Sequence, residues 1–252
     1  MVARVGRATL TIVPSSTVTK TARETTARID QRRRWMWSRV TGVMGGSSGA
    51  ADTYHHGDLP NALRAAAADV IAEKGLGHFS LREVARRAGV SHAAPAHHFG
   101  DTTGLLTSLA VQGFDHLAEV LTAAADGVDD PETRLAAIGR GYVETGLRYP
   151  GHCQVMFRAD VVDRDDPAYQ EAGERAYGIL ADTIRAVATL DNPDLDVDVA
   201  ADLCWSAMQG LLVLYPSMVR RRASLGLSPF DLEQRVTEFT RLLLDGFRAR
   251  IH

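Results

Sequence analysis

Apolar residues recur every three or four positions along most of the chain from Tyr54 onward, which is the spacing of one face of an α-helix. The first such stretch has its apolar face at Leu59, Leu63, Ala66, Ala67, Val70 and Ile71. Asp58 suits the N-cap of this helix, and Gly75 suits its C-terminal end, where a glycine commonly stops a helix. No stretch alternates in the manner of a β-strand. The pattern therefore predicts an all-α fold.

The next segment predicts two short helices in quick succession. Ser80-Leu81-Arg82-Glu83 has the sequence of a capping box, in which the serine side chain caps the helix and the glutamate reaches back to the serine. Phe79 and Val84 occupy the positions of a hydrophobic staple. Gly89 is expected to end this helix, and Ser91 to cap the following one. Two short helices across a tight, glycine-containing turn predict a helix-turn-helix.

A helical bundle is expected after residue 100. Asp101 suits the N-cap of a fourth helix, and proline at the first helical position opens several later ones. Ser228-Pro229 is the expected start of the last helix. The expected spans beyond the fourth helix are 131–149, 151–158, 167–187, 195–215 and 229–250. The last two of these helices are long and apolar, so they are the predicted interface of a two-fold homodimer.

The chain divides into three predicted parts: an N-terminal extension over 1–53, a helix-turn-helix domain over 54–100, and a helical ligand-binding and dimerisation domain over 101–252. Residues 1–50 carry a charge of +7 although the whole chain sums to −3. They are rich in Ser, Thr and Gly, a composition that predicts disorder. Two interpretations stay open: a basic arm that adds phosphate affinity, or a segment without a role because the true start is Met36 or Met44.

Composition and motifs exclude several classes of protein. No apolar run reaches the ~18 residues that a membrane span needs, so no membrane partner is expected. Cys153 and Cys204 have no disulfide or metal-ligand spacing, which favours reduced thiols in the cytoplasm. No P-loop, dinucleotide-binding or nucleophile pattern is present. The sequence therefore predicts a protein that is not an enzyme and takes no cofactor.

The helix-turn-helix segment closely resembles regulators of the TetR family. The resemblance lies in residues 54–59 (YHHGDL), 80–95 (SLREVARRAGVSHAAP) and 98–101 (HFGD). It implies a regulator, usually a repressor, that binds operator DNA in the major groove. The family's DNA contacts carry over to Ser80, Ser91, His92, Ala93, Ala96, His97, His98 and Thr102. Family members usually have Tyr where this chain has Ala96 and Lys where it has Thr102, both at phosphate-contacting positions.

The charge of this domain is nearly balanced, with five Lys or Arg against four acidic residues over 54–100. Weak non-specific DNA affinity is therefore expected unless the basic arm contributes or histidines protonate. His92 and His97 can donate to guanine N7 or O6. Six of the nine histidines lie between His55 and His98. The adjacent pairs point to different faces of a helix, and no HExxH spacing occurs, so no metal site is predicted.

The C-terminal part carries candidates for a small-molecule pocket. Trp205-Ser206-Ala207-Met208-Gln209-Gly210 resembles the Trp-x-x-x-His-Gly element of one TetR subfamily, with Gln209 where that pattern has His. Apolar and aromatic side chains are suited to a pocket between bundle helices, although any one of them alone is more often part of a plain core. The candidates are Tyr142, Cys153, Phe157, Tyr177, Trp205 and Met208. Cys153 is also weighed as a redox sensor, since His152 and Arg158 are near in sequence.

Three functional hypotheses remain at this point. The chain is a ligand-responsive repressor, a DNA-binding protein without an effector, or a helical enzyme. In the first, a ligand in the C-terminal bundle moves the fourth helix. This movement changes the spacing of the two helix-turn-helix domains of the dimer, which lowers DNA affinity. A bundle without a cavity would favour the second. Burial of the helix after Val90 would exclude both DNA-binding hypotheses.

Overall fold

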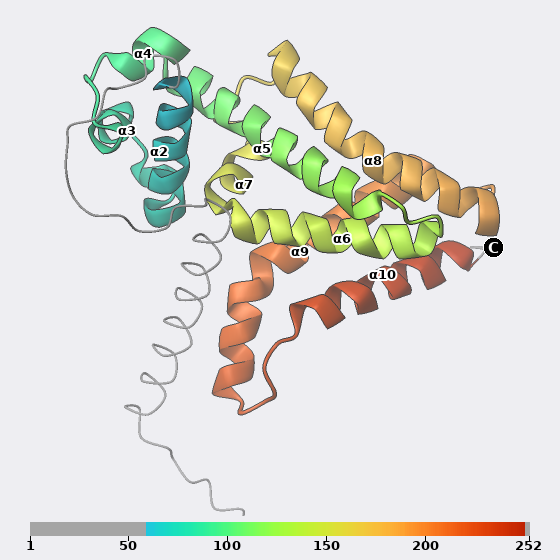
Figure 1. Cartoon of the computed structure of the whole chain (residues 1–252). Helices are drawn as coiled ribbons and strands as arrows, with labels where there is room; N and C mark the ends of the chain where they lie inside the picture. The colour runs from blue at the N-terminus through green and yellow to red at the C-terminus, as the bar shows by residue number, and fades with distance from the viewer. Residues whose placement is uncertain (1–58, 250–252) are drawn as a thin grey trace, which may run out of the picture. The chain divides into compact units, whose positions relative to one another are not determined.

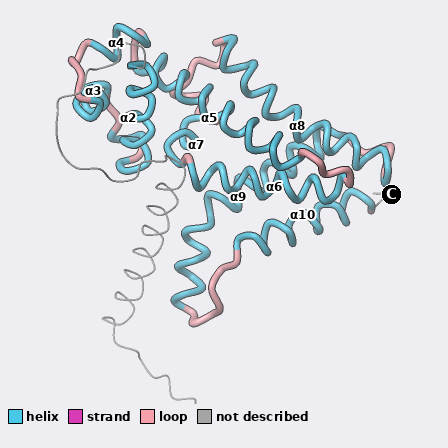
Figure 2. The backbone as a smooth tube through the Cα atoms, viewed as in Figure 1, coloured by secondary structure: helices cyan, strands magenta, loops and turns pink. Residues whose placement is uncertain are grey.

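The computed structural model describes residues 59–249, and within them the chain is entirely α-helical apart from one 3-10 turn and the connecting loops (Figures 1 and 2). The elements are α2 (Leu59–Lys74), the 3-10 turn η1 (Leu76–His78), α3 (Leu81–Ala88), α4 (Ala94–Phe99), α5 (Thr102–Ala125), α6 (Pro131–Arg148), α7 (Pro150–Met156), α8 (Pro167–Asp191), α9 (Val197–Ser224) and α10 (Leu232–Arg248). The predicted all-α fold is confirmed. The predictions for residues 1–53 and for Asp58 lie outside the described residues.

The described residues belong to two compact units. Residues 59–215 and 231–249 form the larger one, and Pro216–Phe230 belong to the other. Both expected functional regions lie in the larger unit. The predicted domain boundary between residues 100 and 101 falls inside this unit and stays a prediction.

The helix-turn-helix is built on one apolar core at one end of α5 (Figure 1). Leu63, Val70 and Ile71 of α2 are fully buried there, as predicted from their spacing. Val84 of α3 packs into the same core, with Phe79 against it. The first part of α5 completes the core through Leu105, Leu106, Leu109 and Ala110. The helix-turn-helix region formed by α2, α3 and α4, called the reading domain below after its expected role, is therefore fixed to α5 by buried apolar surface rather than by a loop alone.

The helix caps of the helix-turn-helix agree only in part with the prediction. The Ser80 hydroxyl accepts a hydrogen bond from the Glu83 backbone N–H at 3.3 Å, and Gly89 ends α3 with φ +70°. The Glu83 carboxylate does not complete the capping box. It accepts instead from Lys74 Nζ at 2.7 Å and from Arg86 at 2.8 and 2.9 Å. Two cations in reach attract a carboxylate more strongly than a neutral backbone N–H does.

The predicted N-cap at Ser91 is wrong. A turn spans 91–93, and α4 begins at Ala94 with Ala93 as a cap residue whose side chain makes no cap hydrogen bond. Pro95 is the reason, because it has no N–H to donate to the Ser91 carbonyl four residues earlier. That carbonyl accepts from the Ala94 N–H at 3.0 Å, which closes a tighter turn. Pro95 itself is buried and fixes α4 to the domain.

The bundle has α5 at its centre, between α6 and α8 (Figure 1). Asp101 caps α5 and Asp130 caps α6, as expected, each by accepting a backbone N–H at 2.9 Å. A second apolar core contains the later part of α5, including Phe114, Leu117 and Leu121. The short helix α7 packs against both α5 and α2. One long helix therefore carries the core of the reading domain on its first half and the core of the bundle on its second.

Two predicted helix ends are corrected by the structure. α8 continues four residues past Val187, to Asp191. α9 runs through Pro216 to Ser224 instead of stopping at Tyr215. An internal proline removes one backbone hydrogen bond, but the helix continues because the residues before and after the proline keep theirs. The chain turns away just past the end of α9, at Gly226 (φ +63°), and the Leu227 N–H donates to the Arg222 carbonyl.

The predicted start of the last helix at Ser228-Pro229 is also wrong. α10 is capped by Asp231, whose carboxylate accepts from the Gln234 N–H at 2.9 Å. Ser228 is already engaged, since Arg222 donates to both its hydroxyl and its carbonyl oxygen at 2.9 and 2.8 Å. A free acidic side chain three residues later is the better cap.

Candidate DNA-binding surface and ligand cavity

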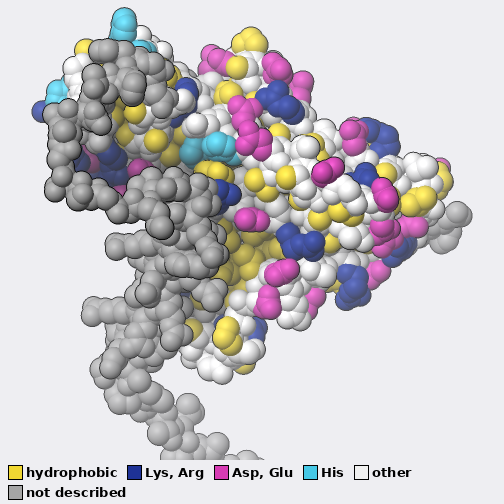
Figure 3. Space-filling view, viewed as in Figure 1, with side chains coloured by type: hydrophobic (Ala, Val, Ile, Leu, Met, Phe, Trp, Pro, Cys, Tyr) yellow, Lys and Arg dark blue, Asp and Glu magenta, His cyan; other side chains and the backbone are white. Residues whose placement is uncertain are grey.

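Every residue predicted to contact DNA is exposed in the structure. These residues are Ser80 before α3, Ser91, His92 and Ala93 in the turn, Ala96, His97 and His98 on α4, and Thr102 at the start of α5. Figure 3 shows histidine side chains at the outer surface of the region that contains α4. The condition that would have excluded DNA binding, burial of the segment after Val90, is not met.

The opposite face of α4 is held to the domain. Phe99 is half-buried against the reading-domain core, and the Arg64 guanidinium lies 6.0 Å from its ring centroid. Arg64 also donates to the Ser108 hydroxyl at 3.1 Å, which links α2 to α5 behind α4. This arrangement fixes the orientation of α4 while its polar face stays open.

Ion pairs neutralise most of the positive charge of this region. Glu83 pairs with Lys74 and Arg86, and these two cations hold the pKa of its carboxyl at about 2, with Arg86 the larger influence. Arg87 pairs with Glu73 at 2.5 Å and lowers the pKa of that carboxyl as well. The near-neutral charge predicted from the sequence therefore corresponds to cations that are already paired within the domain.

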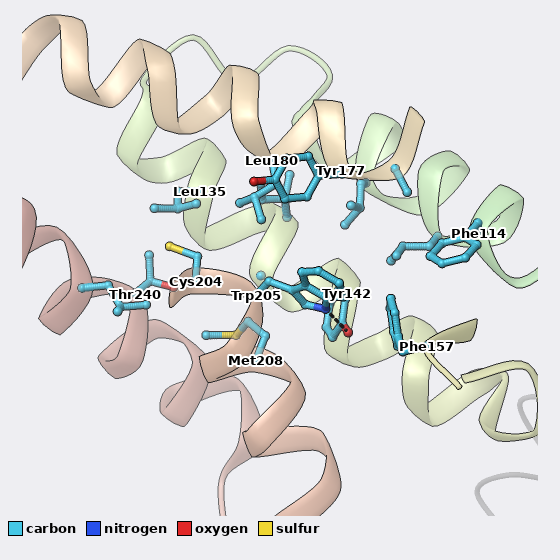
Figure 4. Close-up of a pocket in the computed structure, with 16 residues that line it drawn as sticks. Phe114, Leu135, Tyr142, Phe157, Tyr177, Leu180, Cys204, Trp205, Met208 and Thr240 are labelled. Atoms are coloured by element: carbon cyan, nitrogen blue, oxygen red, sulfur yellow. Dashed lines mark hydrogen bonds between the residues drawn. The ribbon is translucent and has the colours of Figure 1, made fainter. Parts of the chain in front are cut away.

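A cavity of about 70 Å³ lies in the bundle between α5, α6, α8, α9 and α10, and Phe157, directly after α7, is also part of its wall (Figure 4). We call it the bundle cavity. Its lining residues are Phe114, Leu117, Leu121, Leu135, Ile138, Gly139, Tyr142, Phe157, Ala176, Tyr177, Leu180, Cys204, Trp205, Met208, Thr240 and Leu243. The wall is almost wholly apolar, as small-molecule sites commonly are.

Of the six residues predicted to line a pocket, the structure brings five together around the bundle cavity: Tyr142, Phe157, Tyr177, Trp205 and Met208. Cys153 is the exception. It packs against the bundle core beside the cavity, and burial raises the pKa of its thiol to about 11. A thiol that stays protonated is a poor nucleophile, so the redox-sensor interpretation of Cys153 loses its chemical basis.

A chain of hydrogen bonds connects the polar atoms of the cavity wall. Trp205 Nε1 donates to the Tyr142 hydroxyl at 3.0 Å, and that hydroxyl donates to Gln209 Oε1 at 2.8 Å (Figure 4 draws the first bond). Burial raises the pKa of Tyr142, so this phenol is neutral. Gln209, which departs from the histidine of the resembled element, is thus the acceptor that ends the chain.

The sequence did not single out the cavity residues contributed by α5. Phe114, Leu117 and Leu121 continue the same apolar stripe that buries Leu105 and Leu109, and nothing in the spacing marks where core becomes cavity wall. Phe114 contacts the aromatic residues Phe157 and Tyr169, with ring centroids 5.5 Å apart in both pairs. One helix therefore joins the cavity wall to the core of the reading domain.

Among the described residues, no cluster of three or more His, Cys, Asp or Glu side chains is arranged to hold a metal ion. One described helix, α9, is long and apolar enough to cross a membrane by length and composition alone, although its Ala200, Ala201, Cys204, Met208 and Leu211 are buried in the bundle.

Two family models match separate parts of the chain. The one described as "Bacterial regulatory proteins, tetR family" matches residues 63–109, and the one described as "Tetracyclin repressor-like, C-terminal domain" matches residues 135–243. Together they cover the helix-turn-helix, the first part of α5 and most of the helices that surround the bundle cavity.

Known proteins are similar over the same regions. The HTH-type transcriptional regulator BetI of Yersinia pestis (strain Pestoides F) is 38% identical over 73 residues, which are 28% of this chain and 37% of that protein. The match thus spans little more than a third of the relative. A Rhodococcus sp. RHA1 protein of unknown function is 27% identical with a TM-score of 0.64, covering 79% of this chain and 100% of that one. A tetR-family regulatory protein from Rhodococcus RHA1 is 21% identical with a TM-score of 0.60, covering 75% and 96%.

Proposed function

We propose, from the premise that this chain belongs to the TetR family of bacterial regulators, that it is a sequence-specific transcriptional repressor which releases operator DNA when a small molecule binds its bundle. The observation that carries the proposal is the exposed polar face of α4 on a fixed support, joined by α5 to an apolar cavity. The protein acts by binding rather than by catalysis. Because its target is operator DNA, we propose that it works in the cytoplasm.

Recognition of DNA is assigned to α4 and the turn before it. The donors and acceptors that read base edges come from Ser91, His92 and His97. The phosphate contacts are assigned to Ser80 and Thr102. In a dimer, two such helices about 34–36 Å apart would match successive major grooves of a palindromic site. Since Lys74, Arg86 and Arg87 are paired within the domain, base contacts carry a larger share of the affinity than phosphate contacts do.

A mobility shift with the DNA upstream of the chain's own coding sequence tests this assignment. Replacing His92 and His97 with alanine is expected to weaken specific binding by at least tenfold, because each lost base contact is worth about 1–3 kcal/mol. His78→Ala is the matched control, since His78 is also exposed but lies on η1, outside the recognition segment. Operator affinity that is unchanged in the double variant, with a normal helical spectrum, would contradict the assignment.

The homodimer is proposed to form through α9 and α10. Exposed apolar residues lie along one face of α9 at Val199, Leu203, Val213 and Leu214, and Leu242 of α10 is 59% exposed. The spacing of the α9 residues is that of a single helical stripe. The stripe passes Gly210, where an added Cβ would meet nothing within 4 Å, so a second helix can approach closely. A second copy of the chain would cover this surface, which also accounts for the apolar character of α9 without a membrane.

Val213→Glu is expected to shift the protein from dimer to monomer in sedimentation velocity, because the variant buries two like charges near the two-fold axis of the proposed interface. Leu190→Glu is the control, since Leu190 is similarly exposed, at 68% against 63% for Val213, but lies on α8. A Val213→Glu protein that remains dimeric would show that another surface forms the dimer.

Coupling between the cavity and DNA is assigned to α5. Its first half is part of the reading-domain core and its second half walls the bundle cavity. A ligand that moves Phe114 or Leu117 therefore moves the support of α4. By linkage, the ligand weakens DNA binding by the same factor that DNA weakens ligand binding.

A further inference from the structure

The wall of the bundle cavity has no ionisable cation or carboxylate. None of its sixteen lining residues is Asp, Glu, Lys, Arg or His. The groups with an acidic hydrogen are the thiol of Cys204 and the phenols of Tyr142 and Tyr177, and burial raises the pKa of all three, that of Cys204 to about 12. The wall is therefore uncharged at neutral pH.

The few polar atoms in the wall are mostly paired with protein atoms. Trp205 Nε1 donates to Tyr142, Tyr142 donates to Gln209, and the Thr240 hydroxyl donates to the Val236 carbonyl at 3.0 Å. A ligand with a formal charge would lose its hydration here, and no side chain of the wall itself offers it a counter-ion. An uncharged apolar ligand loses little hydration on entering and gains contact with the wall.

One polar group in the wall can change its partner. The Tyr142 hydroxyl donates to Gln209, whose half-buried side chain lies one turn of α9 beyond Trp205. A ligand carbonyl beside Tyr142 could take over this hydrogen bond, while the Trp205 N–H continues to hold the phenol in place. The Tyr142 hydroxyl is thus a donor available at one point of a mainly apolar surface, whereas the other phenol of the wall, Tyr177, is engaged by the Asp202 carboxylate.

We propose, as a deepening of the repressor function above, that the effector is a compact, uncharged and mainly apolar molecule with one hydrogen-bond acceptor that binds the Tyr142 hydroxyl. A phenyl ketone or a short neutral ester has this chemistry. Carboxylates, phosphate esters, thioesters of coenzyme A and amines do not. The cavity volume of about 70 Å³ is roughly half of the ~150 Å³ that holds one benzene ring, so the wall must move apart even for a one-ring ligand, and a compact molecule is favoured over a larger one.

Three probes of nearly equal shape test the proposal on the full chain: cumene, acetophenone and benzoate. They present an apolar group, a carbonyl and a carboxylate at the same point of a phenyl ring. In isothermal titration, we expect acetophenone to bind, cumene to bind up to tenfold more weakly, and benzoate to bind at least a hundredfold more weakly. Benzoate that binds as tightly as acetophenone would overturn the proposal.

Two variants locate the binding in the cavity. Tyr142→Phe keeps the ring and removes the hydroxyl, so it should abolish the preference for acetophenone over cumene. Ala176→Leu adds volume to the cavity wall, where Ala176 is buried, and should weaken both neutral probes. A preference that survives in Tyr142→Phe would show that the carbonyl binds elsewhere and would overturn the role of Tyr142. Thermal unfolding of each variant confirms that it is folded, and if Ala176→Leu is not, Met208→Phe serves in its place.

The proposed function and the ligand class fail separately in this design. Operator binding without any probe reports on the repressor function alone. If the operator is bound but no neutral probe binds, the ligand class is wrong and the repressor function stands. If acetophenone binds but no DNA is recognised, the ligand class stands and the DNA-binding proposal fails.

Discussion

Gly151→Ala is expected to destabilise the protein by about 2 kcal/mol or more, although alanine normally favours a helix over glycine. Gly151 lies in the first turn of α7 and faces α2. A Cβ at this position would lie 2.1 Å from the Ala68 carbonyl oxygen and 2.8 Å from the Ala68 Cα. These are backbone atoms of a buried helix, so they cannot rotate away, and α7 itself must move.

The size of this effect follows from two opposing contributions. Overpacking of a filled interior costs about 1–3 kcal/mol and sometimes more, and a backbone clash belongs at the upper end of this range. The gain in helix propensity from glycine to alanine is at most about 1 kcal/mol and is smaller in a first turn. For a chain of this size, we expect the midpoint of thermal unfolding to fall by roughly 4–8 °C.

Gly178→Ala is the matched control. Gly178 is also helical, in α8, and a Cβ there would meet nothing within 4 Å. This substitution should leave the midpoint unchanged or raise it by a few degrees. Equal midpoints for Gly151→Ala and the unaltered protein would mean that α7 and α2 are not in close backbone contact. Because this contact joins the bundle to the reading domain, the variant should also lower operator affinity in the mobility shift.

The parts of the fold that could be predicted are those decided by local sequence. The apolar spacing of α2, the Ser80 cap, the Asp101 and Asp130 caps and the stop at Gly89 each depend on neighbours within about one turn. Two of the errors arose where a charged side chain of another helix competed. Glu83 is drawn to Lys74 on α2, and Ser228 is held by Arg222, so neither makes the local bond that its sequence suggests.

The candidate site was predicted unevenly for a related reason. Exposed DNA-facing residues could be placed by resemblance, because a short helix-turn-helix has nearly the same geometry wherever it occurs. Tyr142, Trp205 and Met208 could be proposed from residue type. The contribution of α5 could not, since Leu117 in a cavity wall and Leu109 in a filled core have the same spacing and chemistry. Only the packing of five helices determines which of the two has empty space beside it.

Acid is expected to weaken the fold through His152, a buried histidine on α7 that the sequence marked only as a neighbour of Cys153. His152 is 7% exposed, and its Nε2 lies 3.1 Å from Gln112 Oε1 on α5. Its Nδ1 is buried without a hydrogen-bond partner. The neighbouring rings are those of His116 and Tyr149, at 5.6 and 5.7 Å between centroids. Burial, followed by the nearby His116, lowers the pKa of His152 to about 4.

The sign of the pH effect follows from this lowered pKa. Above about pH 6.5, His152 is neutral in both the folded and the unfolded chain and costs nothing. Between about pH 6.5 and 4 the unfolded chain binds a proton that the folded chain does not, so the free energy of unfolding falls as the pH falls. A difference from 6.5 to about 4 corresponds to a loss of about 3 kcal/mol by pH 4.

Urea unfolding at several pH values between 7.5 and 4 measures this loss, and His152→Gln isolates it. Glutamine stays neutral and can still donate to Gln112, so the variant should lose about 3 kcal/mol less than the unaltered protein over the same pH interval. His78→Gln, at an exposed position of η1, should leave the pH dependence unchanged. Carboxylates titrate alike in all three proteins, so they cancel in the comparison. Parallel pH profiles for His152→Gln and the unaltered chain would contradict this prediction. They would show that water reaches His152 between α7 and α5.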